Sequence, residues 1–115
     1  KKRPIANSPF GITGLETSLS LTYTELVCGG YLTPMQMVEK MSYNPAKIVG
    51  IDRGTLCPGA VADITIMDPE AEYVIDRNDF VSMGHNTPFD GRKVKGVVRY
   101  TLVNGEKVYT GKDVQ

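Results

Sequence analysis

The chain has 115 residues, with 13 basic and 13 acidic side chains and a formal net charge of zero at neutral pH. This length allows one domain at most, and the balanced charge argues against nucleic acid and anionic membranes as partners, because no long-range field attracts them. No apolar run reaches the roughly 20 residues of a membrane helix. The two cysteines lack Cys-x-x-Cys spacing, so we expect a soluble protein of the reducing cytoplasm.

The first part of the chain predicts a loop followed by an amphipathic helix. Residues 1–14 contain several prolines and glycines and few periodic apolar positions, which is typical of an extended loop. Four apolar side chains then recur at helical spacing: Leu15, Leu19, Tyr23 and Leu26. Cys28-Gly29-Gly30 should end this helix.

A second helix should begin at Thr33. Thr33 can cap the helix with its side chain, and Gln36 completes a capping box three residues later. Asn44 and Pro45 are expected to break this helix, because Asn44 can cap a new one and Pro45 fits a first helical position. A separate short helix would then end near Gly50.

The second half of the chain predicts turns and strands. Alternating residues favour a half-buried strand at 62–66, which a turn at Asp68-Pro69 should close. Three further strands are expected at residues 72–76, 93–103 and 106–109. Asn104-Gly105 is the strongest signal for a two-residue hairpin turn in the chain.

The residues by themselves offer few catalytic groups. His85 is the only histidine, and its place among turn-forming residues favours a solvated or hydrogen-bonded side chain over a catalytic base. Acidic pairs such as Asp76 and Asp79 flank turns, where exposed carboxylates are common. Asp63 lies inside a strand and should accept hydrogen bonds from the backbone. We therefore predict no catalytic residue and no metal ligand in this chain.

Three stretches of the sequence resemble a known family. Asn-Pro-Ala at 44–46, followed by Gly-x-Leu-x-x-Gly-x-x-Ala-Asp at 54–63, is similar to the amidohydrolase superfamily. Residues 9–17 and 86–91 resemble the bacterial-type, class I dihydroorotases of that superfamily. The order of the stretches matches the C-terminal third of such an enzyme. The chain also begins with lysine, so we expect a C-terminal fragment.

The resemblance implies an α+β fold. Terminal helices of a (β/α)8 TIM barrel would be followed by the C-terminal strands of a small β-sandwich, a partial amidohydrolase fold. Residues 1–49 would be the end of the barrel domain, with the substrate loop and the last helices. Residues 50–115 would be the C-terminal part of the composite β-sandwich domain. Open strand edges and an uncovered helix face would favour a homo-oligomer.

The resemblance also implies part of a zinc-dependent dihydroorotase. This enzyme interconverts dihydroorotate and N-carbamoyl-L-aspartate in de novo pyrimidine biosynthesis, and its zinc lowers the pKa of bound water. The family's zinc ligands are expected outside this chain, so the fragment alone should be inactive. The pair corresponding to Phe10 and Gly11 lines the family's substrate pocket with backbone groups, and glycine allows a ring to approach closely. Phe10 and Gly11 are therefore the predicted substrate-binding residues.

Two other functions stay open. One is a non-catalytic dihydroorotase-like subunit kept for assembly with a partner such as aspartate transcarbamoylase. The other is a hydantoinase- or allantoinase-type cyclic amidohydrolase, against which the Gly-Leu-Glu-Thr run at 14–17 argues. In the main interpretation the partners are the small-molecule substrate, the missing N-terminal part of the same enzyme and further copies of the chain.

Overall fold

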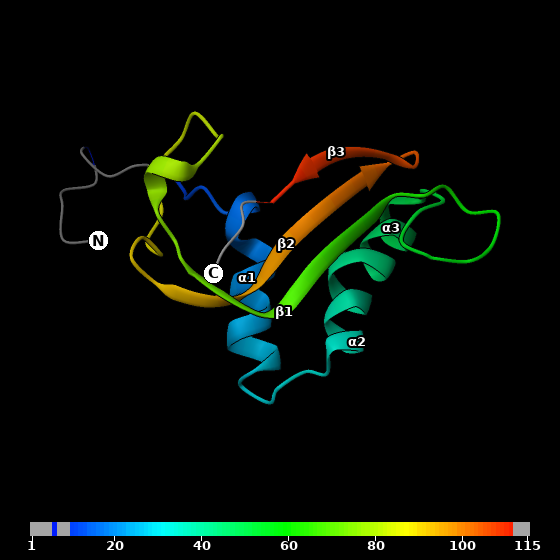
Figure 1. The fold of residues 1–115 in the computed structure, drawn as a ribbon, viewed down its shortest axis with the longest axis horizontal. Coiled ribbons are helices and arrows are strands. Elements are labelled where there is room, and N and C mark those ends of the chain that lie inside the picture. Colours follow the sequence, from blue (N-terminus) through cyan, green and yellow to red (C-terminus); the bar gives the residue numbers. More distant parts are fainter. Residues whose placement is uncertain (1–5, 7–9, 112–115) are drawn as a thin grey trace.

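The computed structural model describes residue 6 and residues 10–111. The described residues form two continuous helices and one antiparallel sheet of three strands in the order β1-β2-β3 (Figure 1). The strands are β1 (Ile64–Val74), β2 (Lys93–Val103) and β3 (Glu106–Thr110). A single 3-10 turn, η5 (Arg77–Asp79), lies between β1 and β2.

The first helix occupies residues 15–27, as the apolar periodicity predicted. It begins with the 3-10 turn η2 (Leu15–Thr17), continues as α1 (Ser18–Thr22) and ends with the π-helical turn η3 (Tyr23–Val27). Gly30 follows with a φ of 78°, a left-handed conformation that glycine adopts without steric cost. The predicted glycine exit from this helix is therefore confirmed.

The second helix occupies residues 34–49 and consists of α2 (Pro34–Val38), the π-helical turn η4 (Glu39–Tyr43) and α3 (Asn44–Val49). Its predicted capping box is confirmed. The Gln36 backbone N–H donates to Thr33 Oγ1 at 3.2 Å, and the Thr33 N–H donates to Gln36 Oε1 at 2.8 Å. These two bonds satisfy donors that have no partner within the helix.

The predicted break at Asn44 and Pro45 was wrong. Asn44 has helical dihedral angles, with φ −65° and ψ −44°, and the helix continues through it. Pro45 has no N–H and its ring crowds the preceding turn of an α-helix. The Asn44 N–H donates to Glu39 O, five residues earlier, so a wider π-helical turn directly precedes the proline. Such a turn accommodates the lost hydrogen bond without ending the helix.

Strand β1 also differs from the prediction, because no turn ends it at Asp68-Pro69. The strand bulges there, and its pairing with β2 resumes at Glu72 opposite Lys95. Asp68 Oδ1 accepts the backbone N–H groups two and three residues later, at 3.1 and 3.2 Å. Pro69 cannot donate to a strand ladder, so the bulge falls where pairing would fail.

The hairpin between β2 and β3 agrees with the sequence prediction. Asn104 and Gly105 have φ values of 52° and 80°, as a type I′ turn requires. The Asn104 N–H donates to Asp63 Oδ1 at 2.9 Å, and Arg53 Nε donates to Asp63 Oδ2 at 2.6 Å. The predicted bonding of Asp63 to the backbone is thus confirmed, and the loop before β1 is tied to the hairpin.

Side chains of the first helix hydrogen-bond the backbone of β2. Ser20, which is 4% exposed, donates its hydroxyl to Gly96 O at 2.6 Å. Thr24 Oγ1 accepts the Lys95 N–H at 2.8 Å. Gly96 has a φ of 85°, and a Cβ built there would lie 3.2 Å from a ring carbon of Tyr23. Helix and strand therefore approach closely at a position that favours glycine.

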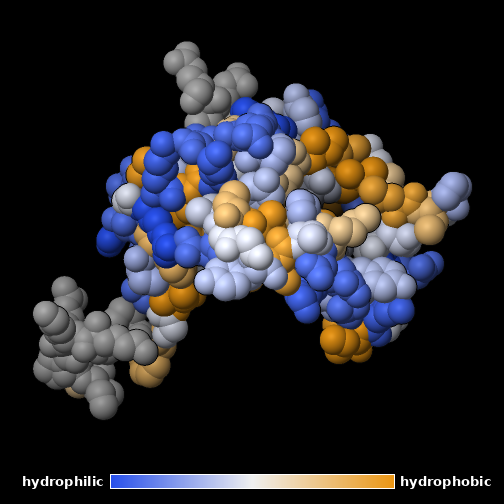
Figure 2. Space-filling view, turned by 90° about the horizontal axis from the view of Figure 1, so that it is seen from below, coloured by the Kyte–Doolittle hydropathy of each residue, from blue (hydrophilic) through white to orange (hydrophobic). Residues whose placement is uncertain are grey.

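The apolar residues of the described part divide between a small core and an extensive surface. The buried apolar residues are Met37, Ala46, Ile75, Val94 and Val97. Many large apolar side chains are exposed, and Figure 2 shows several apolar areas separated by hydrophilic residues on one face. Neither of the two helices has the length and apolar character needed to cross a membrane.

Replacing Gly96 with alanine tests the contact between helix and strand. Gly96→Ala should lower the free energy of unfolding by about 1–2 kcal/mol from the left-handed φ alone, with a further loss from the crowded Tyr23 ring. Denaturant unfolding measures the change. Gly14→Ala is the control, because Gly14 has a φ of −138° and open space around it. Equal stability losses in the two variants would contradict this description of the contact.

Candidate functional site

The predicted substrate loop is hydrogen-bonded to a loop more than 70 residues later. Asn86 Nδ2 donates to Gly11 O at 2.6 Å, and the Thr13 N–H donates to Asn86 O at 2.8 Å. The Thr13 hydroxyl donates to Gly84 O at 3.0 Å. We call residues 10–14 and 81–87 together the paired loops. They bring together the two stretches that resemble class I dihydroorotases.

Glu16, at the start of the first helix, links this helix to the second of the paired loops. Its Oε1 accepts the Ser82 hydroxyl at 2.7 Å and the Ser82 N–H at 3.0 Å, and its Oε2 accepts the Val81 N–H at 3.0 Å. The Ser82 hydroxyl, followed by the two N–H groups, lowers the pKa of Glu16 from its ordinary value. Sequence reasoning missed this role, because no local pattern connects Glu16 to residues 65 positions away.

Phe10 and Gly11 lie at the exposed end of the paired loops. The Phe10 side chain is fully exposed. Gly11 has a φ of 72°, and, its chain neighbours aside, no atom of the described residues lies within 4 Å of the place where a Cβ would be. Among the described residues, no side chain therefore blocks the approach of a ligand to the Gly11 backbone on that side. The assignment of both residues to substrate binding stays a prediction.

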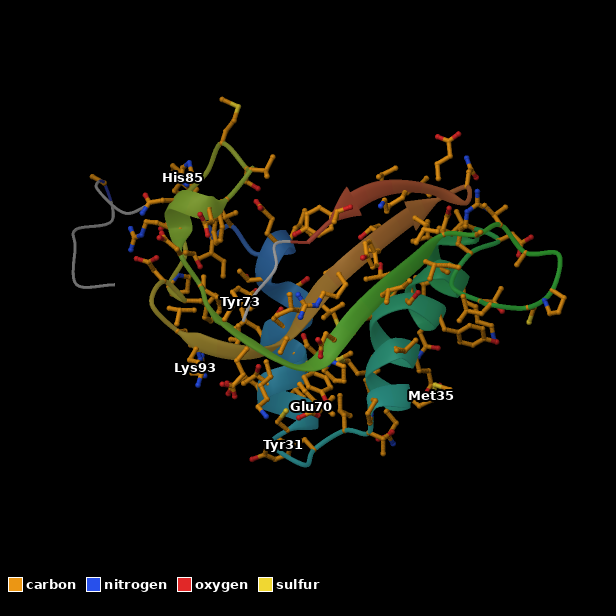
Figure 3. The ribbon with its side chains drawn as sticks, in the orientation of Figure 1. Tyr31, Met35, Glu70, Tyr73, His85 and Lys93 are labelled. Atoms are coloured by element: carbon orange, nitrogen blue, oxygen red, sulfur yellow. The ribbon has the colours of Figure 1, made fainter. Side chains whose placement is uncertain are left out.

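His85 is a hydrogen-bonded loop histidine, as the sequence predicted. Its Nδ1 lies 2.5 Å from Arg77 O, and because a carbonyl only accepts, Nδ1 carries the proton. The ring also stacks on Phe80, with centroids 6.4 Å apart and planes at 12°. Figure 3 shows His85 beside η5, at the end of the molecule that carries the paired loops. These two contacts give His85 a structural role in holding its loop against η5.

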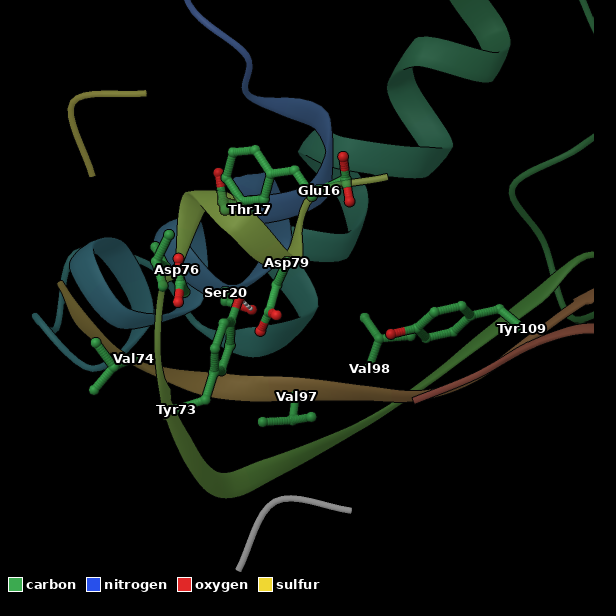
Figure 4. A pocket seen from close by; sticks show the side chains of 12 residues that line it. Glu16, Thr17, Ser20, Tyr73, Val74, Asp76, Asp79, Val97, Val98 and Tyr109 are labelled. Carbon is green, nitrogen blue, oxygen red and sulfur yellow. Dashed lines mark hydrogen bonds between the residues drawn. The ribbon is translucent and has the colours of Figure 1, made fainter. Parts of the chain in front are cut away.

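A cavity of about 170 Å³ lies between the start of the first helix, the sheet and η5 (Figure 4). Glu16, Ser20, Tyr73, Asp76 and Asp79 supply polar groups to its lining. The Tyr73 hydroxyl donates to Ser20 Oγ at 3.1 Å, and Asp76 Oδ1 accepts the Asn78 N–H within η5 at 2.8 Å. Ser20, Tyr73 and Asp76 thus contribute to holding the fold, and Asp76 is an exposed carboxylate beside a turn, as predicted.

The described residues do not fit the zinc ion that the resemblance implies. Within residues 6 and 10–111, no three side chains of His, Cys, Asp or Glu gather in a group that could hold a metal. A catalytic zinc site needs at least three protein ligands. The two cysteines, Cys28 and Cys57, are both exposed and unpaired with each other.

Residues 6–108 match the family model described as the amidohydrolase family. The chain belongs to this family. It is 54% identical over 101 residues to a dihydroorotase of Pelotomaculum thermopropionicum, covering 88% of this chain and 24% of the relative. It is 49% identical over 109 residues to a dihydroorotase of Caldanaerobacter subterraneus, covering 95% of this chain and 25% of the relative. The chain thus spans about a quarter of the length of these curated amidohydrolase relatives.

Solved amidohydrolase structures share the arrangement of helices and strands. An L-hydantoinase from Arthrobacter aurescens superposes with a TM-score of 0.87 at 35% sequence identity, covering 96% of this chain and 25% of that one. The predicted α+β class and the membership of the amidohydrolase fold are therefore confirmed. The finer division into barrel and sandwich segments stays a prediction.

Acidification tests the link between Glu16 and the loop at residues 81–82. Because the folded pKa of Glu16 is lowered, its stabilising effect is present above its ordinary pKa of 4.5 and is lost as the pH falls through the folded value. Glu16→Gln should lower the Tm by a few degrees near neutral pH, and this difference from the wild type should shrink at acidic pH.

Two serine variants complete this test. Ser82→Ala removes one donor to Glu16 and should reproduce part of the loss in Tm. Ser42→Ala changes an exposed serine of the second helix and should leave the Tm unchanged. A Tm difference between Glu16→Gln and the wild type that stays constant down to strongly acidic pH would contradict the assignment.

Proposed function

We propose that this chain is part of a dihydroorotase, which interconverts dihydroorotate and N-carbamoyl-L-aspartate in pyrimidine biosynthesis. The observation that carries the proposal is the bonding of residues 10–14 to residues 84–86. Residues 10–14 and Asn86 belong to the two stretches, 9–17 and 86–91, that resemble class I dihydroorotases. The similarity to curated dihydroorotases along most of the chain supports the same function.

In this proposal the backbone of Phe10 and Gly11 binds the dihydropyrimidine ring. The ring carries amide N–H and C=O groups, which backbone donors and acceptors can match. The open space at Gly11 allows such an approach, and the hydrogen bonds to Asn86 and Thr13 hold the loop in place before the substrate arrives. A preorganised loop binds more tightly, because little conformational entropy is lost.

The chemistry itself would reside in other residues of a longer polypeptide. Zinc would need ligands from outside the described residues, since no group of ligands gathers within them. Residues 1–49 would then belong to the barrel domain and residues 50–115 to the sandwich domain of one cytoplasmic enzyme. The exposed apolar side chains, such as Leu15, Ile48 and Leu56, would be covered by the rest of this polypeptide or by a second copy.

One observation favours a second candidate function. The structural similarity to an L-hydantoinase fits a cyclic amidohydrolase that acts on hydantoins or on related rings. The two activities differ in the carboxylate that dihydroorotate carries on its ring and that unsubstituted hydantoin lacks. A dihydroorotase-like subunit without activity, assembled with a transcarbamoylase, is the remaining alternative.

Substrate assays separate these functions. The complete polypeptide that carries this chain, purified with zinc, should hydrolyse dihydroorotate and cyclise N-carbamoyl-L-aspartate, with hydantoin and allantoin as control substrates. Turnover of hydantoin without turnover of dihydroorotate would favour the hydantoinase. A folded, zinc-loaded protein that acts on none of the four compounds would contradict the proposed enzyme and favour the assembly subunit.

A further inference from the structure

The Gly11 carbonyl has a fixed partner within the paired loops. Asn86 Nδ2 donates to Gly11 O at 2.6 Å, although the two residues are 75 positions apart. Gly11 has a φ of 72°, and its Cβ position contacts no other part of the described chain, so packing against the described residues does not hold its backbone in this conformation. The side-chain amide of Asn86 is therefore the contact that orients the peptide between Gly11 and Ile12.

Asn86 is itself held by the surrounding backbone. Its backbone carbonyl accepts the Thr13 N–H at 2.8 Å. Asn86 therefore both donates a hydrogen bond to the first of the paired loops and accepts one from it. The next residue, Thr87, is buried, and its hydroxyl accepts the Phe89 N–H at 3.2 Å. The Thr13 hydroxyl also donates to Gly84 O at 3.0 Å. The side chain of Asn86 thus extends from an anchored segment and can position the loop at residues 10–14.

We propose that Asn86 is a positioning residue for substrate binding, which sets the orientation of the Gly11–Ile12 peptide in the substrate loop. This inference rests on the proposed dihydroorotase function and adds a residue to its site. Asn86 does not touch the substrate. It acts through Gly11, whose carbonyl it holds toward residues 84–87.

The orientation has a chemical consequence. In a trans peptide the carbonyl and the following N–H point in opposite directions, and the described residues contain no cis peptide bond. With Gly11 O bound to Asn86, the Ile12 N–H faces away from residues 84–87. Within the described part of the chain, the Ile12 N–H donates to no other group. It is thus a fixed donor for an acceptor oxygen of the ligand, such as a ring carbonyl of dihydroorotate.

The test is steady-state kinetics with dihydroorotate, using the zinc-loaded complete polypeptide. Asn86→Ala and the isosteric Asn86→Asp should raise KM about 5-fold, which corresponds to one neutral hydrogen bond of ordinary net strength. The value of kcat should stay unchanged, because a positioned backbone donor binds the ground state and the transition state alike. A purely structural defect would lower the Tm and the active fraction without raising KM.

Three control variants make the outcome specific. Asn78→Ala removes a side-chain amide that bonds Asp76 in the nearby turn η5, so KM should not change. Gly11→Ala places a side chain at a left-handed φ in the loop itself and should raise KM about 10-fold. Gly59→Ala has the same kind of strain, with a φ of 87° and open space, but lies in the loop before β1 and should leave KM unchanged.

The possible results distinguish the two proposals. A raised KM for Gly11→Ala together with wild-type KM for both Asn86 variants would overturn the role of Asn86. An unchanged KM for Gly11→Ala would overturn the substrate loop instead. NMR of the 115-residue chain adds a measurement that does not depend on catalysis, because Asn86→Asp should shift the amide resonances of Gly11 and Ile12 whereas Asn78→Ala should not. Unshifted resonances in Asn86→Asp would also contradict the positioning role.

Discussion

The contact between the first helix and the middle strand determines how this molecule is arranged. Ser20 and Thr24 hydrogen-bond the backbone of β2 at Lys95 and Gly96, where the absence of a side chain lets helix and strand approach closely. The buried hydroxyl of Ser20 also accepts from Tyr73 on β1, so one short polar network connects the helix with two strands. Burial makes such a network costly to break, because a polar group that loses its partner there is not rehydrated.

This contact fixes the start of the first helix, and the start of the helix in turn fixes the paired loops. Glu16 lies one turn before Ser20 and binds the backbone at residues 81 and 82. Four residues after Ser82, the side chain of Asn86 donates a hydrogen bond to the Gly11 carbonyl. The predicted substrate loop is thus anchored at several points to rigid elements, which is the arrangement that a preorganised binding site would require. The loop stays exposed while its backbone is held.

Local patterns in the sequence predicted the elements that depend on local interactions. The capping box at Thr33 and Gln36 and the type I′ turn at Asn104-Gly105 involve residues within three positions of each other, and both are confirmed. The bulge at Asp68 and the helix that continues through Pro45 depend on the partner strand and on a π-helical turn, which short patterns do not reveal. The candidate site followed from resemblance at Phe10 and Gly11. The roles of Glu16 and Asn86 required the fold, because their partners lie more than 60 residues away.

The most direct test of the central claim is a crystal structure of the zinc-loaded complete polypeptide with bound dihydroorotate. The central claim is that the anchored backbone at Phe10 and Gly11 forms one wall of the substrate site. We expect a backbone N–H or C=O of residues 10–12 within about 3 Å of a ring oxygen or nitrogen of the ligand, with Gly11 O still bound to Asn86. A ligand that binds in the same enzyme without contacting residues 10–12 would contradict the claim.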